Sequence, residues 1–102
     1  MPEIKIIDKS FSLFRKRGNG TVRYEVWEID GAVSRYNLAY INHLIHGGDN
    51  GRVLGYDNRH GHHRHFMGAV EPVDTGCYEE IEQRFEQEWA EILEAYNAKR
   101  NR

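Results

Sequence analysis

The chain has little cysteine, little proline and no long apolar stretch. Its 102 residues include one cysteine, Cys77, and two prolines. A single cysteine forms neither an internal disulfide nor a thiol-rich metal site, which is typical of a protein from a reducing compartment. No apolar run approaches the roughly 20 residues that a membrane-spanning helix needs, and no charged segment followed by a long apolar stretch opens the chain. We therefore expect a cytoplasmic protein with no membrane partner.

A strong excess of one charge is also absent, because the formal net charge is -2. The charge is unevenly divided, however. Residues 1–70 carry ten Lys/Arg against seven Asp/Glu, and residues 71–102 carry four against nine. The length suits one domain over 1–102. The basic part permits an anionic partner such as RNA, although its excess is small beside that of dedicated nucleic-acid-binding proteins.

The hydrophobic pattern predicts an antiparallel sheet followed by one long helix, an α+β fold. Alternating apolar and polar residues indicate about five strands within residues 4–70, the last of them at 64–70, with glycine-rich turns between them. A helix is expected over 76–99, with Thr75 as its N-cap. Its apolar residues recur at spacings of three and four and predict packing against one face of the sheet: Ile81, Phe85, Trp89, Ile92 and Tyr96.

Histidine is the residue type that points to chemistry. All six histidines lie between His43 and His65, and four of them fall within residues 60–65. Imidazole changes charge near neutral pH and serves as an acid, a base or a metal ligand. The cluster is therefore the first candidate for a functional site.

The pairing of two strands around the histidines decides which side chains meet. If residues 59–61 form the turn, Asp57 lies opposite His63 and Gly55 opposite His65. Asp57 would then orient His63, and either His63 or His65 would act as general base or acid. A slip by one residue would instead pair Asp57 with Arg64 and Tyr56 with His65. The sequence leaves both registers open.

Three interpretations of the cluster remain. In the first, His63 and His65 bind a metal ion with Asp57 or His60 as a third ligand. In the second, the histidines are hydrogen-bonded surface residues of a hairpin. In the third, at least one of them performs acid-base chemistry or binds an anion, and Arg59 or Arg64 holds a phosphate.

The block from Tyr56 to Phe66, YDNRHGHHRHF, carries a family resemblance. Together with the YNLAY run at 36–40 and the Glu71-Pro72 pair after it, this block resembles the TumE-type family of toxins from bacterial and archaeal toxin–antitoxin modules. The resemblance implies a toxin encoded beside a helix-turn-helix antitoxin. The positions that match the family pattern are Tyr56, Asp57, Asn58, His60, Gly61, His63, Arg64 and His65.

The resulting hypothesis is a type II toxin that is a metal-independent ribonuclease without a cofactor. One histidine would take the proton of a ribose 2′-hydroxyl and a second would protonate the leaving 5′-oxygen. The expected catalytic residues are His63, His65, Asp57 and His60, and the expected substrate-binding residues are Tyr56, Asn58, Arg59 and Arg64. The partners considered are the antitoxin, RNA and a second copy of the chain. The alternative is a non-catalytic protein that binds its antitoxin or a metal.

Overall fold

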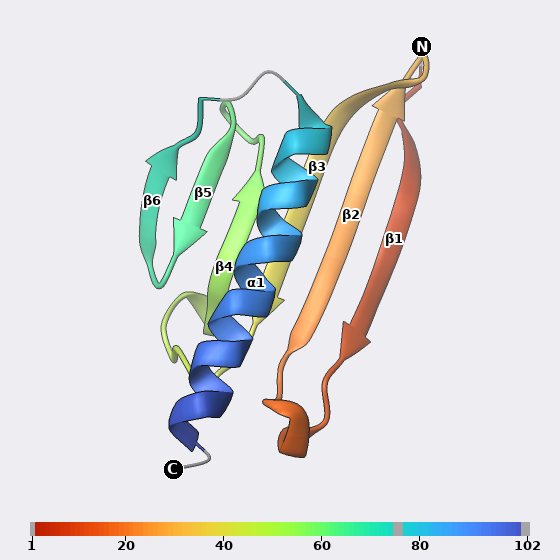
Figure 1. Cartoon of the computed structure of the whole chain (residues 1–102). Helices are drawn as coiled ribbons and strands as arrows, with labels where there is room; N and C mark the ends of the chain where they lie inside the picture. Colours follow the sequence, from red (N-terminus) through yellow and green to blue (C-terminus); the bar gives the residue numbers. More distant parts are fainter. Residues whose placement is uncertain (1, 75–76, 101–102) are drawn as a thin grey trace.

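The fold is one antiparallel sheet with a single long helix on one of its faces. A computed structural model describes residues 2–74 and 77–100, and Figure 1 shows the arrangement. The sheet has six strands, and its spatial order follows the chain order. The strands are β1 (Ile4–Ser12), β2 (Thr21–Ile29), β3 (Ala32–Ile41), β4 (Arg52–Asp57), β5 (His63–Phe66) and β6 (Ala69–Pro72). Two short 3₁₀ helices, η1 (Arg15–Arg17) and η2 (Asp49–Gly51), and the helix α1 (Tyr78–Arg100) complete the described part.

The predicted α+β class is confirmed, but the predicted number of strands is corrected from about five to six. The single strand expected at 64–70 is a hairpin, in which Phe66 of β5 pairs with Ala69 of β6. Met67 and Gly68 form its two-residue turn with φ of 47° and 88°. Such turns need positive φ at both central residues and are usually signalled by Asn-Gly. Because methionine rather than asparagine occupies the first position, nothing in the sequence signalled this turn.

The core lies between α1 and the covered face of the sheet. Alternate residues of β2, β3 and β4 point to this side, and α1 crosses it over β3 and β4 (Figure 1). Ile81 and Phe85 of α1 are completely buried there. The expected N-cap, Thr75, lies outside the described residues. The largest fully buried side chains on the strands are Tyr36, Tyr40, Tyr56, Leu38 and Leu54.

The other face of the sheet is not covered by a helix, and we call it the open face. It carries the side chains that alternate with the buried ones, among them Glu25, Asn37, Asp57 and His65, so it is mainly polar. This polarity follows from the period of two along each strand. In the part of the chain that the structure describes, no helix has the length and apolar character that crossing a membrane requires.

Candidate active site on the open face of the sheet

Strand pairing between β4 and β5 brings an acid and an imidazole together on the open face. Asp57 pairs with His63 and Gly55 with His65, which is the first of the two registers considered from the sequence. The carboxylate of Asp57 nevertheless contacts the diagonal neighbour, with Oδ2 2.8 Å from Nε2 of His65. The side chains of His65 and Asp57 are 15% and 19% exposed, so the contact is largely shielded from water.

The second ring nitrogen of His65 contacts an arginine. Nη2 of Arg52 lies 3.1 Å from Nδ1 of His65, and Nε of Arg52 lies 2.9 Å from Oδ2 of Asp49. Because a guanidinium only donates, Nδ1 is the acceptor of this hydrogen bond. Nε2 then carries the proton and donates to Asp57. These contacts assign the neutral tautomer in which Nδ1 holds the basic lone pair.

Gly55 makes room for this arrangement. A Cβ atom at residue 55 would lie 2.8 Å from Cδ of Arg52, which is closer than van der Waals contact allows. The absence of a side chain at Gly55 therefore lets the Arg52 side chain pass over the strand and reach His65. Arg52 and the role of Gly55 were not expected from the sequence.

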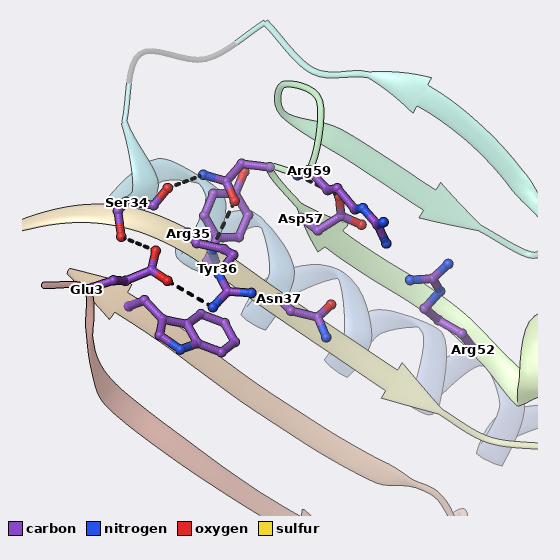
Figure 2. A pocket seen from close by; sticks show the side chains of 10 residues that line it. Glu3, Ser34, Arg35, Tyr36, Asn37, Arg52, Asp57 and Arg59 are labelled. Atoms are coloured by element: carbon purple, nitrogen blue, oxygen red, sulfur yellow. Dashed lines mark hydrogen bonds and ion pairs between the residues drawn. The ribbon is translucent and has the colours of Figure 1, made fainter. Parts of the chain in front are cut away.

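A polar groove of about 770 Å³ adjoins the Asp57–His65 pair. Figure 2 shows its side chains, which come from β2, β3 and β4, from Glu3 just before β1 and from the loop that follows β4. Three guanidinium groups line it, those of Arg35, Arg52 and Arg59, together with Trp27, Asn37 and Asp57. Arg35 is paired with Glu3, which also lines the groove, and Arg52 with Asp49, each at 2.9 Å, whereas Arg59 has no ion pair with a described carboxylate. The groove thus combines guanidinium groups, an aromatic ring and a proton acceptor, a combination suited to a phosphodiester. Trp27, Arg35 and Asn37 were not expected from the sequence, because they belong to strands far from the histidine block.

A charged network beside the groove positions Asn37. Nδ2 of Asn37 donates to Oε1 of Glu25 at 3.2 Å. Glu25 also contacts Arg23 at 3.1 Å and Lys5 at 2.8 Å. The Arg23 guanidinium is the main reason why the pKa of the Glu25 carboxyl falls from 4.5 to about 2, and Lys5 and Asn37 lower it further.

We predict that Glu25→Gln lowers the free energy of unfolding by about 1 kcal/mol at pH 7. A depressed carboxyl pKa stabilises the folded state above the unfolded pKa, near 4.5, and this contribution disappears as the pH falls toward 2. Urea denaturation of parent and variant at neutral pH and at about pH 3 measures the difference. It should shrink at the lower pH, and a difference that is constant with pH would contradict the assignment.

Asn58 and His62 contact backbone and aromatic groups of β3. Oδ1 of Asn58 accepts from the backbone N–H of Tyr36 at 3.0 Å, and its Nδ2 donates to the carbonyl of Ser34 at 3.0 Å. The Tyr36 hydroxyl and Nδ1 of His62 are 2.5 Å apart, and their rings are stacked. Burial raises the pKa of Tyr36. The two Asn58 bonds extend the contact between β3 and β4 beyond their last paired residues, Asn37 and Asp57, and hold Asn58 in the lining of the groove.

Tyr56 and Arg64 lie on the covered face, opposite Asp57 and His65. The Tyr56 hydroxyl donates to Oε1 of Glu88 on α1, and Nη2 of Arg64 lies 2.6 Å from Oε2 of the same carboxylate. Arg64 also contacts Glu71 at 3.2 Å. Burial, followed by the nearby Glu88, raises the pKa of Tyr56 to about 12. The structure thus places both side chains in a link between sheet and helix, away from the groove.

The two remaining expected catalytic histidines lie at or before the beginning of β5. His63 is on the open face, where its Nδ1 donates to the carbonyl of Gly61 at 2.9 Å. His60 is exposed in the β4–β5 loop with φ of 65°. Among the described residues no group of three or more His, Cys, Asp or Glu side chains is arranged to hold a metal ion. The structure therefore places Asp57 and Arg59 in the lining of the groove, His65 next to the groove through its contact with Asp57, and His63 opposite Asp57 on the neighbouring strand, and it leaves His60 apart.

Fold and groove together define a small α+β protein with a polar site on the open face of its sheet. Comparison with protein-family models matches residues 6–96 to the family described as Toxin TumE. Because the match covers most of the chain, the protein belongs to the TumE toxin family, and the resemblance noted in the sequence is confirmed. A toxin family implies an antitoxin as partner. Neither a curated protein nor a solved structure matches the chain significantly.

Proposed function

We propose that this protein is the toxin of a type II toxin–antitoxin module and a metal-independent ribonuclease whose active site is the groove on the open face. The observation that carries the proposal is the His65 imidazole held between the Asp57 carboxylate and the Arg52 guanidinium, beside a groove lined by three arginines. A positioned imidazole with a defined tautomer is suited to general base catalysis. Guanidinium groups bind phosphate oxygens and stabilise the charge of a phosphorane.

The mechanism begins with an exchange of partners at Arg52. A phosphodiester in the groove attracts the Arg52 guanidinium, which leaves Nδ1 of His65 free to accept the proton of the adjacent ribose 2′-hydroxyl. The 2′-oxygen attacks phosphorus, the bond from phosphorus to the 5′-oxygen breaks, and Asp57 stabilises the imidazolium through Nε2. Arg59 or Arg35 contacts the phosphorane. The products are a 2′,3′-cyclic phosphate and a 5′-hydroxyl.

His63 is the proposed general acid that protonates the leaving 5′-oxygen. It is on the same face as His65 and two residues away along β5. Its Nδ1 donates to the Gly61 carbonyl, whereas its Nε2 has no hydrogen-bond partner among the described residues. In the imidazolium form Nε2 carries the second proton and donates it to the 5′-oxygen, which leaves a neutral ring with its proton on Nδ1. Asn58 acts in this scheme by positioning the groove, and no described contact gives His60 a part in the reaction.

The purified toxin is expected to cleave single-stranded RNA at an unchanged rate after extensive treatment with a chelator. The reason is that imidazole and guanidinium groups carry each step of the proposed reaction. Gel analysis of labelled RNA measures the rate, and the resistance of the new 3′ end to end-labelling identifies the cyclic phosphate. If chelation abolishes cleavage and added zinc restores it, the mechanism depends on a metal and the proposed one is wrong.

The antitoxin is proposed to be the helix-turn-helix product of the adjacent reading frame. The acidic C-terminal region, with nine Asp/Glu against four Lys/Arg in residues 71–102, supports a protein partner of complementary charge. When the two proteins are co-expressed at equal levels, we expect one complex in gel filtration at micromolar concentration. The elution volume also tests whether the toxin is a homodimer. Separate elution of the two proteins would contradict the proposed pairing.

A further inference from the structure

One end of the molecule joins η1 to the C-terminal end of α1 (Figure 1). The Arg100 guanidinium donates to the backbone carbonyls of Arg15 and Lys16, and the second of these bonds is 2.7 Å long. Nδ2 of Asn97 donates to the carbonyl of Arg17 at 3.1 Å. Three carbonyls of η1 are thus bonded to α1. These bonds hold segments that are about 80 residues apart in the sequence as one surface.

This surface gathers positive charge without nearby negative partners. We call it the basic end and define it by Arg15, Lys16, Arg17, Lys99 and Arg100. None of these five side chains forms an ion pair with a carboxylate of a described residue. Most cations elsewhere are neutralised, since Lys5, Arg23, Arg35, Arg52, Arg64 and Arg84 each contact Asp or Glu. The protein as a whole has a formal net charge of -2, whereas the basic end is a local region of positive charge.

An aromatic side chain stands beside these cations. Phe14 directly precedes η1 and is 79% exposed, far more than an apolar ring in a packed core. It lines a shallow hollow together with Ser12, Leu13, Lys16 and Arg17. Exposed aromatic rings between cations are typical of surfaces that bind single-stranded nucleic acid, because bases stack on the ring while the cations contact phosphates.

We propose that the basic end is a second RNA-binding surface, separate from the groove, which holds the phosphate backbone of single-stranded RNA and stacks a base on Phe14. The identity of the anion rests on the proposed ribonuclease function. The combination of several cations that have no carboxylate partner with one exposed ring favours RNA over an acidic peptide, which would not need a stacking platform. The surface would bind the substrate at a distance from the cleaved bond and raise affinity without taking part in the reaction.

The test uses the double variant Lys16→Gln/Arg17→Gln and, separately, Phe14→Ala. These side chains are exposed, and Arg100 is kept because its bonds fix η1. The matched control is Lys9→Gln/Arg84→Gln, which removes two exposed cations elsewhere. The probe is a fluorescein-labelled 2′-O-methyl RNA of about 20 nucleotides, a length that exceeds the usual site size of single-strand-binding modules. Because this RNA lacks the attacking hydroxyl, binding is measured whether or not the protein is a ribonuclease.

Fluorescence anisotropy should show that the double variant binds about tenfold more weakly at low salt. The slope of log affinity against log salt should fall by about 1.4, or 0.7 for each lost phosphate contact. Phe14→Ala should weaken binding by about tenfold with little change in slope. The control should bind like the parent, and all variants should keep the parent's circular dichroism spectrum and melting temperature.

Two outcomes would overturn the inference. The first is a double variant that matches the control in both affinity and slope. The second is unchanged RNA binding together with loss of the antitoxin complex, which would make the basic end a protein-docking surface. A parent protein that binds the RNA through this surface but cleaves no unmodified RNA would contradict only the proposed ribonuclease function.

Discussion

His65→Ala is expected to lower the rate of RNA cleavage by about 10²- to 10⁴-fold, the usual cost of losing a general acid or base. Induction of the variant without antitoxin should then cause little growth inhibition. The variant loses the imidazole that the structure holds between Asp57 and Arg52. His63→Ala should produce a loss of similar size if it removes the general acid. Cleavage by purified protein and growth after induction measure the two effects.

Asp57→Asn tests whether the carboxylate acts through His65. The amide keeps the shape but removes the charge that stabilises an imidazolium, so we expect an intermediate loss in kcat with little change in KM. His43→Ala is the matched control, because His43 is exposed and does not line the groove. Each variant must first show the parent's circular dichroism spectrum and antitoxin binding. Full toxicity of folded His65→Ala would remove the basis for the enzyme hypothesis.

Glu88→Ala is expected to lower the free energy of unfolding by about 2 to 3 kcal/mol. Glu88 accepts from the Tyr56 hydroxyl, which is buried in the core, and from Arg64 at 2.6 Å. Removing it leaves both donors without this partner. Breaking a fully buried charge pair costs about 3 to 5 kcal/mol, and the cost is smaller here because the Arg64 and Glu88 side chains are 22% and 27% exposed. Urea denaturation measures the change.

Glu94→Ala on the same helix is the control for Glu88→Ala. Glu94 is exposed and forms no ion pair with a described residue, so the change should stay within about 0.5 kcal/mol. A double-mutant cycle of Arg64→Ala with Glu88→Ala should give a coupling of about 1 kcal/mol or more. Equal effects of Glu88→Ala and Glu94→Ala would show that the bonds of Glu88 to Tyr56 and Arg64 do not stabilise the fold. Arg64→Ala should lower stability while the folded fraction keeps its cleavage rate.

Local patterns predicted much of the fold. The apolar spacing in the last third of the chain predicted the helix and its buried residues Ile81 and Phe85, because helical periodicity depends only on neighbouring residues. A turn over residues 59–61 was one of the two possibilities that the sequence left open, and the pairing of Asp57 with His63 that it implies is the one observed. The turn at Met67 and Gly68 was missed because methionine rarely adopts positive φ, so that residue type gave no turn signal.

Which residues form the candidate site depended on long-range packing. Strict alternation from Asp57 places Val53 rather than Arg52 on the open face. An irregular step opposite Tyr40 and Ile41 instead pairs Ile41 with Arg52, Val53 is fully buried, and the Arg52 side chain reaches His65. A bulge of this kind depends on how two strands pair, so it cannot be recognised from the sequence of either strand alone.

The sequence by itself determined the α+β class, the toxin family and the concentration of imidazoles beside Asp57, because these follow from composition, short-range periodicity and a local motif. Only the tertiary structure decided that Asp57 contacts His65 rather than His63, and that Tyr56 and Arg64 are bonded to Glu88. The same holds for the groove, where β2 and β3 supply Trp27 and Arg35. Each of these contacts joins residues from different strands or from sheet and helix. Their geometry is set by sheet pairing and by the position of α1, which no single stretch of sequence contains.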